Sequence, residues 1–291
     1  MKTIGKLELV LDKQDAYLVC DLIRSRFHLE PVVFERPNQR LVVIAVFLDS
    51  MAQACVLARK IPSDWPIRFS RPLPCREEEW TTFWRHHFHV RDIGSRFRTV
   101  PVWEKPPDRK RINLRIDPGL SFGTGDHFTT RFCLEALEQA WASFKPRSML
   151  DAGTGSGILA IAAVKLGVKR VAAFDNDPVC IKMAKRNAVL NRIGPDRIRF
   201  YEANILERGW GQRPADLVCA NILAGILMQA SAPLWQASQK RLVLTGIREF
   251  EGDSVAETFV ALGAREVARD GDGEWCGIVL ERRTPGNKKT A

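Results

Sequence analysis

The chain has 291 residues, which is long enough for a full α/β domain and a smaller second one. Its content of 45% hydrophobic and 27% charged residues is ordinary for a soluble globular protein, and its formal net charge is +10. The first 15 residues alternate charged and aliphatic side chains, unlike a signal peptide, and the longest aliphatic run, 41–48, is too short to span a bilayer. We expect a monomer without a membrane segment.

The seven cysteines are scattered, and no Cys-x-x-Cys pair suggests zinc binding or redox work. Most lie inside apolar, periodic segments, which indicates buried free thiols. Free thiols are typical of a reducing compartment, so we expect a cytoplasmic protein.

The positive charge is concentrated in two segments. Residues 59–111 hold thirteen Lys and Arg against seven Asp and Glu, and residues 282–291 add four basic residues and no acidic one. The central stretch is a candidate contact for RNA or a ribonucleoprotein surface, and a merely solvated linker is an equal alternative. Residues 284–291 read as a disordered basic tail.

The first 71 residues predict a small α+β domain. Strands are expected at 4–11, 32–34, 41–48 and 67–69, and helices at 13–27 and 51–61. The order βαββαβ is that of a ferredoxin-like module. It contains no catalytic cluster, so we interpret it as a substrate-recognition unit.

Residues 72–111 are expected to connect two domains. Trp80, Phe83, Trp84 and Phe88 recur at helical spacing and predict an amphipathic helix over 77–88. His86, His87 and His89 lie close by, but no fixed carboxylate or cysteine spacing supports a metal site.

Residues 112–283 predict a doubly wound, mostly parallel seven-stranded sheet, because strands and helices alternate at regular spacing. Strands are expected at 148–150, 170–174, 198–201, 217–220, 241–245, 266–268 and 278–282. Helices are expected at 158–166, 179–190 and 253–262.

A cofactor loop follows the first of these strands. The glycines at 153, 155 and 157 form a G-x-G-x-G loop, Asp151 precedes them, and Asp175 ends the next strand, 22 residues after Gly153. The spacing differs from the G-x-G-x-x-G of dinucleotide enzymes, which disfavours a dehydrogenase. The pattern fits S-adenosyl-L-methionine, because bare glycines let the backbone approach the methionine moiety and Asp175 can accept the ribose hydroxyls. Glycines used only for packing are the alternative.

The strand at 217–220 runs into Asn221, followed by Ile222 and Leu223. An Asn at this strand end resembles the motif of enzymes that methylate nitrogen. Its side-chain carbonyl can accept a hydrogen bond from a substrate amine and orient the nitrogen lone pair. The alternative is that Asn221 is only a helix N-cap.

Residues 117–130 contain three glycines and two adjacent threonines, and lead into a helix that we expect to begin near Arg131. The segment is too polar for a core. Because it lies directly before the cofactor strand, we interpret it as a lid.

Together, four motifs resemble the ribosomal protein L-eleven methyltransferase family (PrmA). They are Phe-Gly-Thr-Gly-x-His-x-Thr-Thr, Asp-x-Gly-x-Gly-Ser-Gly, Asp-x-Asp-Pro and Ala-Asn-Ile-Leu-Ala, and the resemblance extends over 80–282. It implies cofactor contacts at Thr130, Gly153, Asp175 and Asn221, to which the loop pattern adds Gly155.

The resemblance also implies the substrate: lysine ε-amines, and an N-terminal amine, of a large-subunit ribosomal protein. The chain departs from the family pattern at Asp126, Phe128 and Thr154, which bears on which amine is accepted. Asn221 is the candidate catalytic residue. An RNA or small-molecule methyltransferase and a non-catalytic adaptor with the same fold remain as alternatives.

Overall fold

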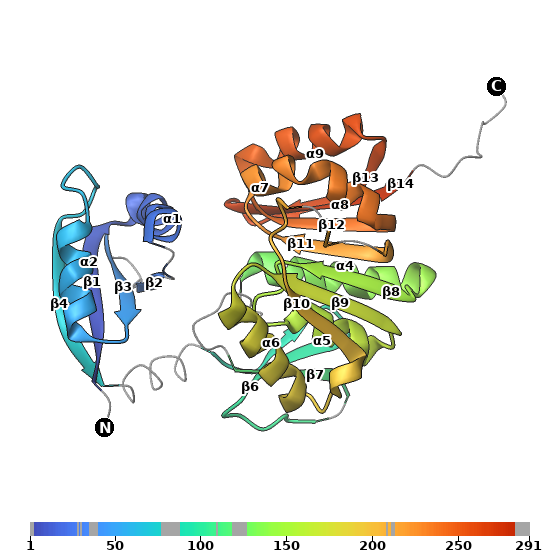
Figure 1. Ribbon diagram of the computed structural model, residues 1–291, viewed down its shortest axis with the longest axis horizontal. Helices are drawn as coiled ribbons and strands as arrows, with labels where there is room; N and C mark the ends of the chain where they lie inside the picture. Colours follow the sequence, from blue (N-terminus) through green and yellow to red (C-terminus); the bar gives the residue numbers. More distant parts are fainter. Residues whose placement is uncertain are drawn as a thin grey trace. The chain divides into compact units, whose positions relative to one another are not determined.

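The computed structural model describes residues 3–27, 29, 31–34, 40–76, 88–108, 110–117, 127–207, 209–210 and 213–282. The chain divides into two compact units, residues 1–87 and 88–291 (Figure 1). The aromatic helix expected over 77–88 and the tail at 284–291 lie outside the described residues, apart from Phe88. No described helix is long and apolar enough to cross a membrane.

The first unit is a ferredoxin-like α+β domain, as predicted. Its elements are β1 (Thr3–Asp12), a 3-10 turn (Lys13–Asp15), α1 (Ala16–Phe27), β2 (Pro31–Phe34), β3 (Leu41–Leu48), α2 (Met51–Lys60) and β4 (Phe69–Arg76). The strands form an antiparallel sheet in the order β2-β3-β1-β4. Alternation along β1 buries Leu7, Leu9 and Leu11 in a core shared with the helices.

The prediction of a short last strand at 67–69 is wrong, because β4 begins at Phe69 and continues to Arg76. Pro72 and Pro74 lie inside it, and prolines ordinarily argue against a strand. They are accepted here because β4 pairs only with β1 and forms one edge of the sheet. Their nitrogens, which carry no hydrogen, occupy positions on the unpaired side.

The interval 72–111, expected to connect two domains, contains regular structure on both sides of residue 87. It holds most of β4, β5 (Arg91–Ile93) and β6 (Phe97–Pro101), and β6 pairs in parallel with β7 (Ile112–Ile116). All of β6 is buried, including the polar Arg98 and Thr99. Two buried polar side chains hide the apolar pattern by which a strand is recognised in a sequence.

The large sheet of the second unit is doubly wound and mostly parallel, as predicted. Its strands are β8 (Ser148–Ala152), β9 (Arg170–Asp175), β10 (Ile198–Glu202), β11 (Ala215–Asn221), β12 (Ser238–Arg248), β13 (Ala264–Gly271) and β14 (Trp275–Arg282). Their order is β10-β9-β8-β11-β12-β14-β13. Only β14 runs antiparallel to its neighbours β12 and β13.

Two groups of helices cover this sheet and form two separate cores (Figure 1). One group is α4 (Phe128–Phe144), α5 (Ile158–Leu166) and α6 (Pro178–Leu190). The other is α7 (Ala224–Gln229), α8 (Ser231–Ala237) and α9 (Gly252–Ala261). Two 3-10 turns, Pro195–Arg197 and Glu249–Glu251, precede β10 and α9. Since α5 is buried almost throughout, the carboxyl end of β8 is held rigidly beneath it.

Candidate active site

The glycine loop follows β8 and has the backbone conformation that glycine permits. Gly153, Gly155 and Gly157 have φ angles of +71°, +51° and +82°. The N–H groups of Gly153 and Thr154 both donate to the carbonyl of Phe174 at 2.9 Å. The loop is therefore folded against the end of β9, and every second position in it carries no side chain.

Asp175 connects this loop to the end of β9. Its Oδ2 accepts from the N–H of Gly155 at 2.9 Å, and its Oδ1 accepts from the N–H of Asp177 at 3.1 Å. Burial raises the pKa of this carboxyl, which backbone hydrogen bonds from Gly155 and Asp177 partly offset. Each carboxylate oxygen still has a lone pair for a further donor such as a hydroxyl.

Asp151, at the end of β8, is 1% exposed. Its Oδ2 accepts from Thr154 Oγ1 at 2.7 Å and from the N–H of Ala160 at 3.2 Å, whereas its Oδ1 is buried without a hydrogen-bond partner. Burial raises the pKa of this carboxyl to about 7, and the neighbouring Asp175 adds to the rise. An unpartnered carboxylate oxygen in a core is costly, so it marks a place where a ligand gains by binding.

Asn221 ends β11 and binds a residue from another part of the chain. Its Nδ2 donates to Thr129 Oγ1 at 3.2 Å. The alternative of Asn221 as a helix N-cap is wrong, because α7 begins at Ala224 with Leu223 at the cap position and no side-chain cap bond. Since the amide nitrogen is used by Thr129, the amide orientation is set and Oδ1 is the atom left to accept.

The helix after the expected lid begins at Phe128 rather than near Arg131. His127 is its N-cap, with Nδ1 accepting from the N–H of Thr129 and lying 2.9 Å from Thr129 Oγ1. A capping histidine is uncommon, which explains why the sequence places the start three residues late. Thr130, a predicted cofactor residue, is 1% exposed and its Oγ1 has no partner.

Close backbone packing joins the glycine loop to Asn221. A Cβ on Gly153 would lie 2.8 Å from Ile222 Cγ1, and a Cβ on Gly246 would lie 2.6 Å from the Ile222 carbonyl oxygen. The N–H of Ile222 also donates to the Thr245 carbonyl at 3.0 Å. The predicted residues Gly153, Gly155, Asp175 and Asn221 thus meet at the carboxyl ends of β8, β9 and β11, as doubly wound sheets lead one to expect.

Two contributors to this arrangement, Gly246 and Asn187, were missed in the sequence, and so was the neighbouring Asn191. Gly246 makes room for the turn after Asn221, and Asn187 and Asn191 of α6 bind backbone outside their own helix. The two asparagines are four residues apart: Asn187 lies inside α6, where asparagine is a poor helix former, and Asn191 is the C-cap of that helix. This four-residue spacing could have indicated that both side chains bind backbone of other segments.

The central part of the expected lid, residues 118–126, lies outside the described residues, and so does Asp126. So do His86 and His87, whereas His89 Nδ1 lies 3.6 Å from a Glu104 carboxylate oxygen. Within the described residues, no group of three or more His, Cys, Asp or Glu side chains is arranged to hold a metal ion. All seven cysteines are free thiols, five of them buried, as predicted.

Several arginines of the basic stretch 59–111 are used inside their own units. Arg68 pairs with Asp12 at 2.6 Å and Arg71 with Glu8 at 2.6 Å. Arg98 pairs with Asp92 at 2.5 Å. These pairs reduce the charge that the stretch offers to RNA.

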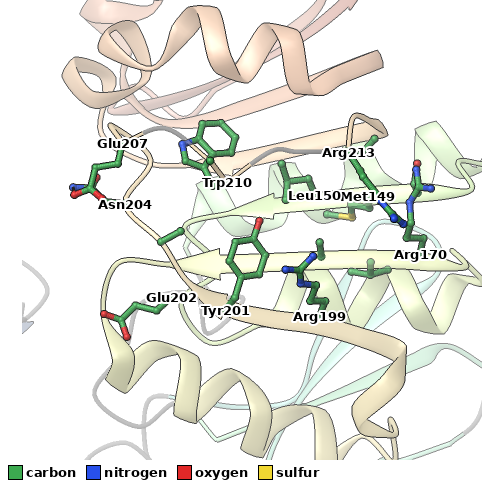
Figure 2. Close-up of a pocket in the computed structure, with 16 residues that line it drawn as sticks. Met149, Leu150, Arg170, Arg199, Tyr201, Glu202, Asn204, Glu207, Trp210 and Arg213 are labelled. Carbon is green, nitrogen blue, oxygen red and sulfur yellow. Dashed lines mark hydrogen bonds between the residues drawn. The ribbon is translucent and has the colours of Figure 1, made fainter.

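A hollow with a volume of about 650 Å³ is lined by residues of β8, β9 and β10 (Figure 2). Its lining residues include Tyr201 of β10 and the three arginines Arg170, Arg199 and Arg213. The connection from β10 to β11 forms no helix in its described part, which leaves this sheet face without a regular cover. Since no predicted cofactor residue lines the hollow, the candidate active site is the carboxyl edge of the sheet.

Comparison with known proteins identifies the family of this chain. A family model described as Ribosomal protein L11 methyltransferase (PrmA) matches residues 21–283. The chain belongs to this family. The resemblance read from the four motifs is thereby confirmed, and the protein is a methyltransferase.

Members of the family from several bacteria align over much of the chain. A ribosomal protein L11 methyltransferase of Chloroflexus aurantiacus is 32% identical over 282 residues, which cover 86% of this chain and 85% of the relative. One from Haemophilus influenzae is 38% identical over 213 residues, or 72% of this chain and 69% of the relative. The crystal structure of a ribosomal protein L11 methylase from Lactobacillus delbrueckii subsp. bulgaricus has a TM-score of 0.61 and 32% identity, and covers 68% of this chain and 100% of that one.

Proposed function

We propose that this protein transfers methyl groups from S-adenosyl-L-methionine to amine nitrogens of ribosomal protein L11. One observation carries the proposal beyond family membership. The Asn221 amide is held by Thr129 at the end of β11, beside a glycine loop that is bonded to Asp175. An amide acceptor next to a nucleoside cradle is suited to methylating nitrogen.

The residues present fit this donor. The glycine loop exposes backbone, and Asp175 keeps lone pairs for the ribose hydroxyls. Asp151 Oδ1 and Thr130 Oγ1 are buried without partners, and such atoms ordinarily find one in a native complex. When bound, S-adenosyl-L-methionine supplies an electrophilic methyl group on a sulfonium. Thr130, Gly153, Gly155, Asp175 and Asn221 are the residues proposed to hold it.

The acceptor amine has to be neutral to attack. For a lysine with a pKa of about 10.4, neutralisation at pH 7 costs roughly 4–5 kcal/mol. Ile222 and the half-exposed Leu223 offer an apolar surface beside Asn221, which lowers an amine pKa by disfavouring the ammonium form. Asn221 Oδ1 then accepts a hydrogen bond from the neutral amine and directs its lone pair.

The direct test is incubation of the purified protein with methyl-labelled S-adenosyl-L-methionine and either purified ribosomal protein L11 or ribosomal RNA. We expect label in the protein, on lysine side chains located by mass spectrometry. Label found only in RNA would establish the alternative substrate class. No transfer to either, with partner binding retained, would support the adaptor.

The role of Asn221 is tested by Thr129→Val, which keeps the side-chain shape and removes the acceptor of the amide N–H. We expect kcat to fall at least about tenfold, the order of one misdirected hydrogen bond. Asn221→Ala should lower kcat further. The matched control is Thr258→Val in α9, a partly exposed threonine whose hydroxyl donates to the carbonyl of Ser254, and it should leave kcat unchanged.

We also propose that the first unit recognises the protein substrate. Phe69 is 55% exposed and pairs with Val10, so both lie on the sheet face opposite the buried leucines of β1. Replacing Phe69 with serine is expected to raise the KM for ribosomal protein L11 with little change in kcat. An unchanged KM would remove this face from substrate recognition.

A further inference from the structure

Asn187 is a fully buried amide in α6 that binds backbone on two other segments. Its Nδ2 donates to the Ser156 carbonyl at 2.9 Å, and its Oδ1 accepts from the N–H of Asp117 at 3.0 Å. Ser156 lies between the second and third glycines of the loop, and Asp117 directly follows β7. One side chain therefore joins the glycine loop to the end of a strand in a different sheet.

The bond to Ser156 fixes one particular peptide group. The Ser156 carbonyl and the Gly157 N–H belong to the same planar peptide unit. Asn187 holds its oxygen, and the Thr154 carbonyl accepts from its N–H at 2.8 Å. With both ends bonded, the peptide cannot rotate, and the left-handed φ of Gly157 is maintained where α5 begins.

The Ser156–Gly157 peptide is tightly packed against α6. A Cβ on Gly157 would lie 2.9 Å from the Cβ of Ala184, three residues before Asn187 on the same face of α6. The loop and α6 are therefore in direct backbone contact. A change in the direction of the Ser156 carbonyl has to be taken up by the glycine loop itself.

Asn191 lies four residues further along the chain, at the C-cap of α6, and its side chain also bonds to the backbone of another segment. Its Oδ1 accepts from the N–H of Arg115 at 3.0 Å, and its Nδ2 donates to the Arg115 carbonyl at 2.6 Å. Its side chain holds β7, and its third hydrogen bond goes to the Asn187 carbonyl at 2.8 Å and not to the glycine loop.

We propose that Asn187 is a positioning residue for the methyl donor: it orients the Ser156–Gly157 peptide and thereby keeps the glycine loop in its binding conformation. Asn191, at the C-cap of the same helix, is also buried and also bound to the β7 segment, but it does not have this role. The inference rests on the proposed binding of S-adenosyl-L-methionine at the loop.

The test compares Asn187→Asp with Asn191→Asp. Each change keeps the side-chain shape and the acceptor oxygen, and replaces the donating amide by a group that, when ionised, cannot donate. The Kd for S-adenosyl-L-homocysteine is measured by calorimetry, the KM for the donor by steady-state kinetics, and Tm by thermal unfolding. We expect both variants to lose Tm, and Asn187→Asp alone to raise the Kd and the donor KM at least about tenfold, with kcat within about twofold.

Equal Kd values for the two variants, or a wild-type Kd in Asn187→Asp, would overturn the inference. If either aspartate variant fails to fold, the same comparison is made with Asn187→Ala and Asn191→Ala, which introduce no charge. A wild-type protein that binds no S-adenosyl-L-homocysteine refutes the proposed donor itself. That result is distinct from a wild type that binds and an Asn187 variant that binds equally well.

Discussion

Asp151 is expected to make the stability of the unliganded protein depend strongly on pH. Its carboxyl is 1% exposed, and its pKa is raised from 3.8 to about 7, chiefly by burial. In the unfolded chain the same group titrates near 3.8. Between these two values the folded state holds a proton that the unfolded state has lost, so the free energy of unfolding falls as pH rises through this window.

The size of the effect follows from the shift of about three pKa units. At about 1.36 kcal/mol per unit, Asp151 contributes about 4 kcal/mol at pH 4 that is almost entirely lost by pH 7. Replacing Asp151 with asparagine removes this titration and leaves the acceptor for Thr154 and Ala160 in place.

The assay is denaturant unfolding of wild type and Asp151→Asn from pH 4 to pH 8. All other carboxyls are common to both proteins, so the difference between the two curves isolates Asp151. We expect the wild type to lose about 4 kcal/mol relative to the variant between pH 4 and pH 7. Parallel curves across this range would show that Asp151 titrates normally and would refute the reasoning.

Three further outcomes are expected. The Glu138 carboxylate accepts hydrogen bonds from Ser95 N–H and O–H, Arg96 N–H and Phe97 N–H at 2.7–3.1 Å. Glu138→Ala should therefore lower the free energy of unfolding by about 3 kcal/mol or more, whereas Glu135→Ala, at an exposed position of the same helix, should lower it by about 0.5 kcal/mol or less. Similar losses in denaturant unfolding would contradict this. Gly246→Ala should abolish methyl transfer, because Gly246 has a φ of +81° and an added Cβ would lie 2.6 Å from the Ile222 carbonyl oxygen. Gly263→Ala is the control: Gly263 has a φ of +92° with open space around an added Cβ, so the change should cost only about 1 kcal/mol of stability and no activity. Binding of the cationic donor near Asp151, whose pKa is raised to about 7, should release protons at pH 6.5. Calorimetry giving identical heats in two buffers of different protonation enthalpy would exclude this.

Much of the architecture could be predicted because apolar periodicity and glycine spacing are local signals. Helix α5 has the predicted bounds, and Asp175 ends β9 as the spacing from Gly153 indicates. Strand β6 could not be recognised, because Arg98 is accommodated only through ion pairs with Asp92 and Asp108. Whether a polar residue is buried depends on partners that a sequence window does not contain.

In the site, too, local features could be predicted from the sequence and contacts between distant segments could not. The loop glycines follow from their spacing, whereas the partner of Asn221 is Thr129, 92 residues earlier in the chain. The sequence left an N-cap role for Asn221 open as the alternative, because local reasoning considers only neighbouring backbone. Asn187 illustrates the converse: its presence inside a helix is visible in the sequence, but its bonds to Ser156 and Asp117 exist only after three segments have come together.

The prolines of β4 limit how the first unit can associate with other chains. Because β4 keeps its pairing with β1, the missing donors at Pro72 and Pro74 belong to the outward row, where only every second residue contributes an N–H. An incoming strand would find two consecutive donors absent on that side. This border of the sheet is thus protected against fibril-like growth and strand exchange, and a peptide that joins by strand addition is left with β2 as its point of entry.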